Sequence, residues 1–266
     1  MSQSTNSKAI AAVITGIVIV SASLVFVLPN LLESPTEIEV TLIYNAGVMI
    51  EAKGVRIFID PLYLPNNYSE LSADVILITH PHTDHYNPED IDEILTNDTL
   101  FVCPKNMTGA IEQYDGFGVN PGDSFLVGDI NITAFPLYLP DYPSGAPSFH
   151  PREANWTSYI IEIDGFTIFH AGDTKYIDEY DQLTGLIDVA FLPIYFDGGL
   201  GPLNASLLPI VDAINTIQPR YAILTHYMTA NLDIFMTEYS ILVDSPSSEI
   251  LGWAYETSRI FTADGA

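Results

Sequence analysis

Four potential metal ligands stand within six residues, directly after a short apolar run. The run is Val75–Ile78, and the ligands are His80, His82, Asp84 and His85. A continuous apolar run of this length predicts a strand buried on both faces. Alternate residues at a strand end share a face, so the first two histidines can chelate one ion while the next two residues reach a second. Because desolvating such a cluster without a metal would be costly, the pattern predicts a metal site. Its imidazole and carboxylate donors suit zinc, iron or manganese.

Strand and turn signals dominate the rest of the chain. Alternating or short apolar runs bounded by Gly, Pro or Asp predict further strands, at residues 38–43, 47–50, 55–60, 124–127, 130–135, 158–163, 166–169, 189–192 and 221–225. The turns Gly128-Asp129 and Asp164-Gly165 predict two hairpins. Pro88 opens a predicted helix that ends at Ile94, and residues 203–217 have an amphipathic helical pattern. This order fits an α/β sandwich of two sheets flanked by helices.

The remaining histidines are few and well placed. The chain has six in total, and His150, His170 and His226 each lie at or beside the end of a predicted strand. A lone histidine is more often a surface or core residue than a ligand, so position alone does not assign these three.

With these residues in view, the chain resembles the metallo-β-lactamase superfamily from about Ile38 to Tyr227. His-x-His-x-Asp-His after a buried strand is the signature of that superfamily. The other matching stretches are Asn45-Ala-Gly47 with Ile57–Pro61, Phe149-His150-Pro151, His170–Thr174 and Thr225-His226-Tyr227. Within the superfamily, the chain is most similar to the metal-dependent hydrolases that include the ascorbate-6-phosphate lactonases.

The resemblance implies an αββα sandwich that holds two divalent metal ions. His80, His82 and His150 would bind the first ion. Asp84, His85 and His226 would bind the second, and Asp173 would bridge the two. Zinc is the expected metal, with manganese or iron as alternatives. His170 is expected to support the site rather than to bind metal.

A hydrolase is the predicted function. Water activated between two metals would attack an ester, lactone, amide or phosphodiester, with Asp84 as the catalytic residue that steers the water and accepts its proton. Tyr195, Asp197 and Tyr227 are candidate substrate contacts. Two alternatives stay open: a non-catalytic metal-dependent binding module, and an iron-dependent redox enzyme on the same fold. The redox enzyme would typically carry Glu in place of His82.

Composition limits the partners. The formal net charge is −26, and a surface this acidic repels phosphate backbones, so a nucleic acid is not an expected partner. The expected partner is a small-molecule or lipid-like substrate. Cys103 is the one cysteine, which excludes an internal disulfide and a thiolate-rich zinc site. We expect it to be a buried structural residue.

The N-terminal part predicts a membrane anchor. Residues 9–28 carry no charge, Lys8 precedes them and Glu33 is the first charge after them. Twenty helical residues span roughly 30 Å, the thickness of a bilayer core. The predicted organisation is a tail (1–8), a transmembrane helix (9–28), a linker (29–37) and a hydrolase domain (38–266).

The positive charge before the helix places the domain outside the cytoplasm. Cleavage as a signal peptide near Ala22, giving a secreted protein, and a buried core helix are the alternatives. Export agrees with six Asn-x-Ser/Thr sequons, at Asn67, Asn97, Asn106, Asn131, Asn155 and Asn204. The oligomeric state stays open.

Overall fold

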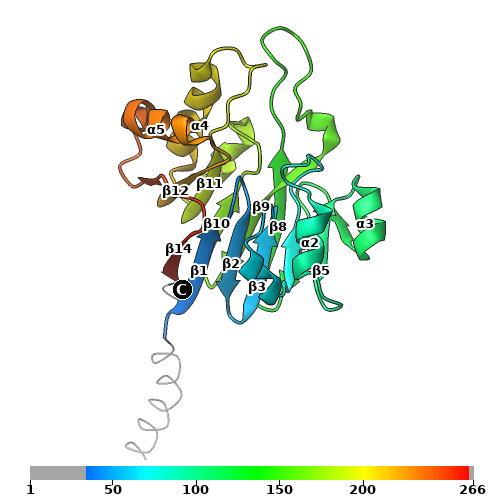
Figure 1. The fold of residues 1–266 in the computed structure, drawn as a ribbon. Coiled ribbons are helices and arrows are strands. Elements are labelled where there is room, and N and C mark those ends of the chain that lie inside the picture. The colour runs from blue at the N-terminus through cyan, green and yellow to red at the C-terminus, as the bar shows by residue number, and fades with distance from the viewer. Residues whose placement is uncertain (1–33, 264–266) are drawn as a thin grey trace, which may run out of the picture. The chain divides into compact units, whose positions relative to one another are not determined.

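The computed structural model describes residues 34–263, which contain two seven-stranded sheets (Figure 1). The first sheet has the order β14-β1-β2-β3-β4-β5-β6. Its strands are β1 (Thr36–Leu42), β2 (Val48–Ala52), β3 (Val55–Ile59), β4 (Val75–Leu77), β5 (Leu100–Pro104), β6 (Phe117–Val119) and β14 (Thr257–Ala263).

The second sheet has the order β13-β12-β11-β10-β9-β8-β7. Its strands are β7 (Ser124–Val127), β8 (Ile130–Leu137), β9 (Trp156–Ile163), β10 (Phe166–His170), β11 (Val189–Pro193), β12 (Tyr221–Thr225) and β13 (Glu249–Leu251).

Helices lie in the connections between strands. The α-helices are α2 (Pro88–Ile94), α3 (Thr108–Tyr114), α4 (Leu203–Ile217) and α5 (Thr229–Ile234). The short 3-10 helices are η1 (Asn66–Glu70), η2 (Arg152–Ala154), η3 (Asp178–Leu183) and η5 (Ser240–Leu242), and η4 (Phe235–Tyr239) is a π-helix.

Strand periodicity builds the layers. On β3, Ile57 and Ile59 belong to the apolar core between the two sheets, whereas Phe58 belongs to the cluster beneath α2 and α3. On β10, Ile168 faces the same central core and Phe169 packs in the cluster with α4. Because successive side chains point to opposite faces, each sheet is apolar on both and is covered on both. Figure 1 shows α2 and α3 on one side of the sandwich and α4 on the other. The predicted αββα sandwich is confirmed.

Local turn chemistry accounts for the predicted hairpins. β1, β2 and β3 pair as an antiparallel meander. β9 and β10 pair antiparallel around Asp164 (φ 48°) and Gly165 (φ 83°). Two positive φ values in a two-residue loop match the right-handed twist of a hairpin, and Asp-Gly accommodates them at low cost. β7 and β8 also pair antiparallel, with Gly128 (φ 58°) in the turn between them.

The structure covers only part of the N-terminal region for which predictions were made. The predicted transmembrane segment 9–28 lies outside the described residues, and none of the helices within residues 34–263 has the length and apolarity to cross a bilayer. β1 begins at Thr36. The first strand therefore takes in the last two residues of the predicted linker.

Parallel pairing gathers strand ends at one edge. β3, β4 and β5 run parallel in the first sheet, and β10, β11, β12 and β13 run parallel in the second. Loops that follow the carboxyl ends of such strands are the usual place for a binding site. All the predicted ligands except His150 follow a strand of these two sets.

Candidate metal centre

The seven predicted ligands come from four separate loops. His80, His82, Asp84 and His85 follow β4, and Asp173 follows β10. His226 is the first residue after β12, and His150 lies in the long segment between β8 and β9, just before η2. Backbone bonds from His85 N and Tyr86 N to His82 O, at 3.0 and 2.8 Å, tighten the β4–α2 loop into a turn. This turn brings four side chains to one place.

One set of donor atoms surrounds the predicted first ion. His80, His82, His150 and Asp173 each offer a ligand atom, and these atoms lie within 4.8 Å of one another. His80 Nε2 is 3.0 Å from His82 Nδ1, and His150 Nε2 is 3.1 Å from Asp173 Oδ2. The arrangement gives three imidazole nitrogens and one carboxylate oxygen, which is a donor set that zinc accepts.

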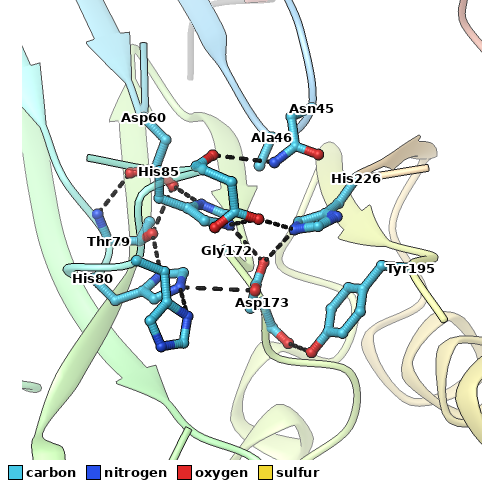
Figure 2. A network of polar contacts seen from close by, with 12 residues as sticks. Asn45, Ala46, Asp60, Thr79, His80, His85, Gly172, Asp173, Tyr195 and His226 are labelled. Atoms are coloured by element: carbon cyan, nitrogen blue, oxygen red, sulfur yellow. Dashed lines mark hydrogen bonds and ion pairs between the residues drawn. The ribbon is translucent and has the colours of Figure 1, made fainter. Parts of the chain in front are cut away.

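A second set lies on the other side of Asp173. Asp84, His85 and His226 also offer atoms within 4.8 Å of one another. Asp173 Oδ1 is 2.9 Å from His85 Nε2 and 3.4 Å from His226 Nε2. The two oxygens of Asp173 therefore face different sets, Oδ1 the second and Oδ2 the first (Figure 2). This geometry suits a carboxylate that bridges two ions.

Several of these atoms lack other partners. Within residues 34–263, the buried atoms without hydrogen-bond partners include His85 Nε2, both ring nitrogens of His150 and Asp173 Oδ1. Their residues are at most 5% exposed. Leaving a buried polar atom unpaired costs about 1–3 kcal/mol, so four at one point call for a missing partner. A divalent cation fits this set, because His85 Nε2, Asp173 Oδ1 and one ring nitrogen of His150 can act as ligands.

Burial and close charges shift the titration of the cluster. Burial, assisted by repulsion from His85, holds the pKa of His80 well below its usual value. Burial opposes charge on His85 too, but attraction by Asp173 and Asp60 outweighs it and holds the pKa of His85 well above its usual value. Burial alone would raise the pKa of Asp173, yet the neighbouring histidines, His85 foremost, hold it well below. Such opposed shifts are typical of functional sites.

Asp60 supports the site from beneath, and its role was not predicted from the sequence. Its Oδ2 lies 2.7 Å from His85 Nδ1, and its two oxygens accept bonds from Thr79 N at 2.8 Å and Thr79 Oγ1 at 2.6 Å. Thr79 Oγ1 is in turn 2.9 Å from His80 Nδ1. A carboxylate behind a ligating histidine fixes the orientation of its ring. The signal available was an Asp-Pro pair at a strand end.

The loop between β1 and β2 joins the two sheets across the site. Asn45 Nδ2 donates to Asp84 O at 3.1 Å, and His226 N donates to Asn45 O at 2.9 Å. Both Asn45 (φ 55°) and His226 (φ 51°) adopt the left-handed conformation. A side chain on Gly47 would come within 2.9 Å of Tyr44 O, so only glycine permits this approach.

His170 has the supporting place expected of it. Its Nε2 is 2.6 Å from Ala46 O, and its Nδ1 accepts from Gly172 N at 3.1 Å. Both ring nitrogens are thus used within the protein, and the buried ring holds the β1–β2 loop against the Asp173 loop.

The three predicted substrate contacts differ in outcome. Tyr195 lies at the site: its hydroxyl donates to Asp173 O at 3.2 Å and its ring centroid is 4.6 Å from that of His226 (Figure 2). Tyr227 uses its hydroxyl on Trp253 O. Asp197 is buried, and its carboxylate accepts from Gly199 N at 2.9 Å and Tyr142 Oη at 3.2 Å. Its bonds therefore serve the loop, which corrects the prediction of a substrate contact.

Two further residues at the site were missed. Trp156 packs against three ligand rings, with centroid distances of 5.2 Å to His80, 5.1 Å to His82 and 5.7 Å to His150. Lys175 is 1% exposed, and burial lowers its pKa to about 7. Its Nζ donates to Tyr195 O at 2.8 Å.

Comparison with known proteins gives the family. A family model described as a beta-lactamase superfamily domain matches residues 43–227, which contain all seven predicted ligands. The chain belongs to the metallo-β-lactamase superfamily. It is similar to the UPF0173 metal-dependent hydrolase of Thermococcus kodakarensis, with 30% identity over 204 residues. The match covers 72% of this chain and 85% of that relative.

Solved structures with a similar fold agree. A crystal structure named as a metal-dependent hydrolase of Parabacteroides distasonis is 26% identical, with a TM-score of 0.68, and the match covers 81% of this chain and 92% of that one. A metallo hydrolase of Ignicoccus hospitalis is 21% identical, with a TM-score of 0.64 and coverage of 85% and 99%; it shows the fold alone. The predicted superfamily, in the branch whose members are named metal-dependent hydrolases, is confirmed.

Proposed function

We propose that this chain is a hydrolase in which two divalent metal ions activate water against a carboxylic ester, lactone, amide or phosphodiester. One observation carries the proposal. The two oxygens of Asp173 face two different sets of ligand atoms, in a site where four buried polar atoms have no other partner among the described residues. One ion would satisfy one set and leave the other unpaired. The names of the relatives as metal-dependent hydrolases support the same reading.

The mechanism assigns a task to each side chain. His80, His82 and His150 would hold one ion, Asp84, His85 and His226 the other, and Asp173 both. Ions held there would polarise the scissile bond of the substrate and make a water nucleophile available near neutral pH. Zinc suits the donor set, with manganese or iron as alternatives.

Asp84 is the carboxylate best placed for proton transfer. Its side chain is 48% exposed, whereas that of Asp173 is 5% exposed. A hydrogen bond with His226 holds the pKa of Asp84 below its usual value, so it is ionised at neutral pH. It would orient the attacking water, accept its proton and pass that proton to the leaving group.

The test is hydrolysis by the purified full-length chain loaded with zinc or manganese. We expect turnover of p-nitrophenyl esters or of simple lactones, lost on chelation and restored by the metal. Asp84→Asn should lower kcat by about 100-fold or more. The control is Asp98→Asn, which changes an exposed aspartate on the loop before β5. Metal-loaded, folded protein that hydrolyses no ester, lactone, amide or phosphodiester would sink the proposal.

We also propose that residues 9–28 anchor the protein in a membrane, with the domain on the extracytoplasmic side. Support comes from the uncharged stretch behind Lys8 and from the sequons. Five of the six sequon asparagines are exposed, and Asn131 is half-buried. Carbonate extraction of membranes from expressing cells tests the anchor. The full-length chain should stay in the pellet and a chain without residues 9–28 should not; full release of both would contradict it.

A further inference from the structure

Large apolar side chains stand exposed on the loops that carry the metal ligands and on the loop that carries Tyr195. Phe149, next to His150, is 70% exposed. Met228, two residues after His226, is 69% exposed, and Phe196, next to Tyr195, is 48% exposed. Burying such side chains stabilises a fold by about 1.5–3 kcal/mol each, so leaving three at one site calls for an explanation.

Aromatic rings continue this surface beside the second ligand set. The Tyr44 ring lies 5.1 Å from that of Tyr63 and 4.7 Å from that of Tyr255, measured between centroids. Tyr255 stacks on Tyr227 at 4.7 Å, and Tyr227 follows His226. Tyr44 and Tyr63 are 39% and 67% exposed. A row of rings therefore runs from Tyr227, the residue after the ligand His226, to the exposed Tyr63.

On the side of the first ligand set, Tyr142 and its buried hydrogen bond link Phe149, beside His150, to the loop of Phe196. Phe149 packs on Tyr142 with a centroid distance of 5.9 Å. The Tyr142 hydroxyl donates to the buried carboxylate of Asp197, whose chain neighbour is Phe196. We call the exposed members of both sides the apolar rim: Tyr44, Tyr63, Phe149, Phe196 and Met228.

The basic side chains close to the ligands in sequence already have partners within the protein. Arg152 and Lys175 are the basic residues nearest in sequence to the ligands. Arg152 pairs with Glu179 and donates to Tyr138 Oη at 3.0 Å. Lys175 is buried against Tyr195. With a net charge of −26 on the whole chain, nothing in these contacts favours an anionic substrate group.

We propose that the apolar rim binds the acyl or aryl group of a neutral carboxylic ester or lactone whose carbonyl carbon lies at the metal centre. The inference rests on the proposed hydrolysis and narrows its substrate. In that reaction the water oxygen bonds to the carbonyl carbon and the acyl C–O bond breaks. The leaving oxygen takes a proton, and the products are an acid and an alcohol.

The length of the substrate's acyl chain is the variable that tests the rim. The metal-loaded full-length chain is assayed with p-nitrophenyl acetate, butyrate and octanoate, and with bis(p-nitrophenyl) phosphate. Because each buried methylene adds about 0.8 kcal/mol, partial burial of the longer chain should raise kcat/KM for octanoate over acetate by about tenfold or more. All three carboxylic esters should be better substrates than the phosphodiester.

Matched variants assign the effect to the rim. Phe149→Ser and Met228→Ser should each lower the octanoate-to-acetate ratio by about threefold or more. Leu126→Ser removes an equally exposed side chain, at 69%, from the edge strand β7 and should leave the ratio unchanged. Binding of the neutral apolar dye Nile red to the metal-free protein should weaken in the first two variants only.

The outcomes separate the two proposals. Ester hydrolysis with no dependence on chain length, or with a ratio that the rim variants leave intact, would overturn the rim and keep the hydrolase. A preference for the phosphodiester would overturn the rim as well. Metal-loaded protein that binds Nile red through the rim but hydrolyses no ester, lactone, amide or phosphodiester would overturn the proposed hydrolysis and, with it, this substrate.

Discussion

Asp60 Oδ2 lies 2.7 Å from His85 Nδ1, and neither side chain is exposed. The pair ties the first sheet, through the end of β3, to a ligand that faces Asp173. The desolvation penalty of a buried carboxylate makes it a poor source of stability by itself. Its position behind a metal ligand supplies the reason for its presence, since it orients the ring and raises the basicity of the ligand.

Asp60→Asn should therefore weaken metal binding by about 10- to 100-fold, because the amide cannot accept from Thr79 N and Oγ1 and from His85 together. Metal titration monitored by calorimetry measures it. Asp74→Asn is the control, since Asp74 accepts one backbone bond, from Arg56 N at 2.7 Å, on the surface. Unchanged affinity in Asp60→Asn would show that the ring is held by other contacts.

Asn45 offers a second test, because its amide and its backbone join the loops of Asp84 and His226. Asn45→Gly tolerates the positive φ and removes only the amide, whereas Asn45→Ala also adds backbone strain of about 1 kcal/mol. Both variants should weaken the binding of one metal equivalent more than that of the other. Only Asn45→Ala should have a clearly lower melting temperature. Asn106→Ala, which removes a side-chain bond to Ala154 O, is the control. Equal weakening of both equivalents would argue against a local effect.

Cys103 should be unreactive in the folded protein. It is fully buried, as predicted, in the cluster beneath α3, and burial raises the pKa of its thiol to about 12. Because the folded pKa lies above the unfolded value of about 8.5, this group's contribution to stability is complete below that value and is lost as pH rises toward 12.

At pH 8, labelling of Cys103 by a disulfide reagent should be at least about 100-fold slower in the native protein than in urea. Cys103→Ser provides the blank. Stoichiometric labelling of the native protein within seconds would mean that the β5 region opens readily.

Sequence predicted the parts of the site that are local. His80, His82, Asp84 and His85 lie on one loop, so their spacing alone brought them together. The helix bounds Pro88–Ile94 and Leu203–Ile217 were also readable, because proline and the 3.6-residue period mark them. The other ligands depended on the resemblance, since His150, Asp173 and His226 come from distant loops.

Long-range pairing was not readable. β14 (Thr257–Ala263) completes the first sheet by pairing with β1, although Ser258 and Arg259 weaken its apolar pattern. Asp60 and Asn45 bind residues 25 and 39 positions away. Such contacts are set by how the sheets stack, and no local period encodes them.

The central claim is that two metal ions share Asp173. Elemental analysis of the purified full-length chain, after reconstitution and removal of excess metal, tests it most directly. We predict about two equivalents per chain, with a clear loss in Asp173→Asn and in His82→Ala and none in Asp164→Asn, whose carboxylate pairs with Lys53 at the surface. Zinc or manganese would fit hydrolysis, and predominant iron would favour the redox alternative. Well-folded protein that binds one equivalent or none would contradict the account.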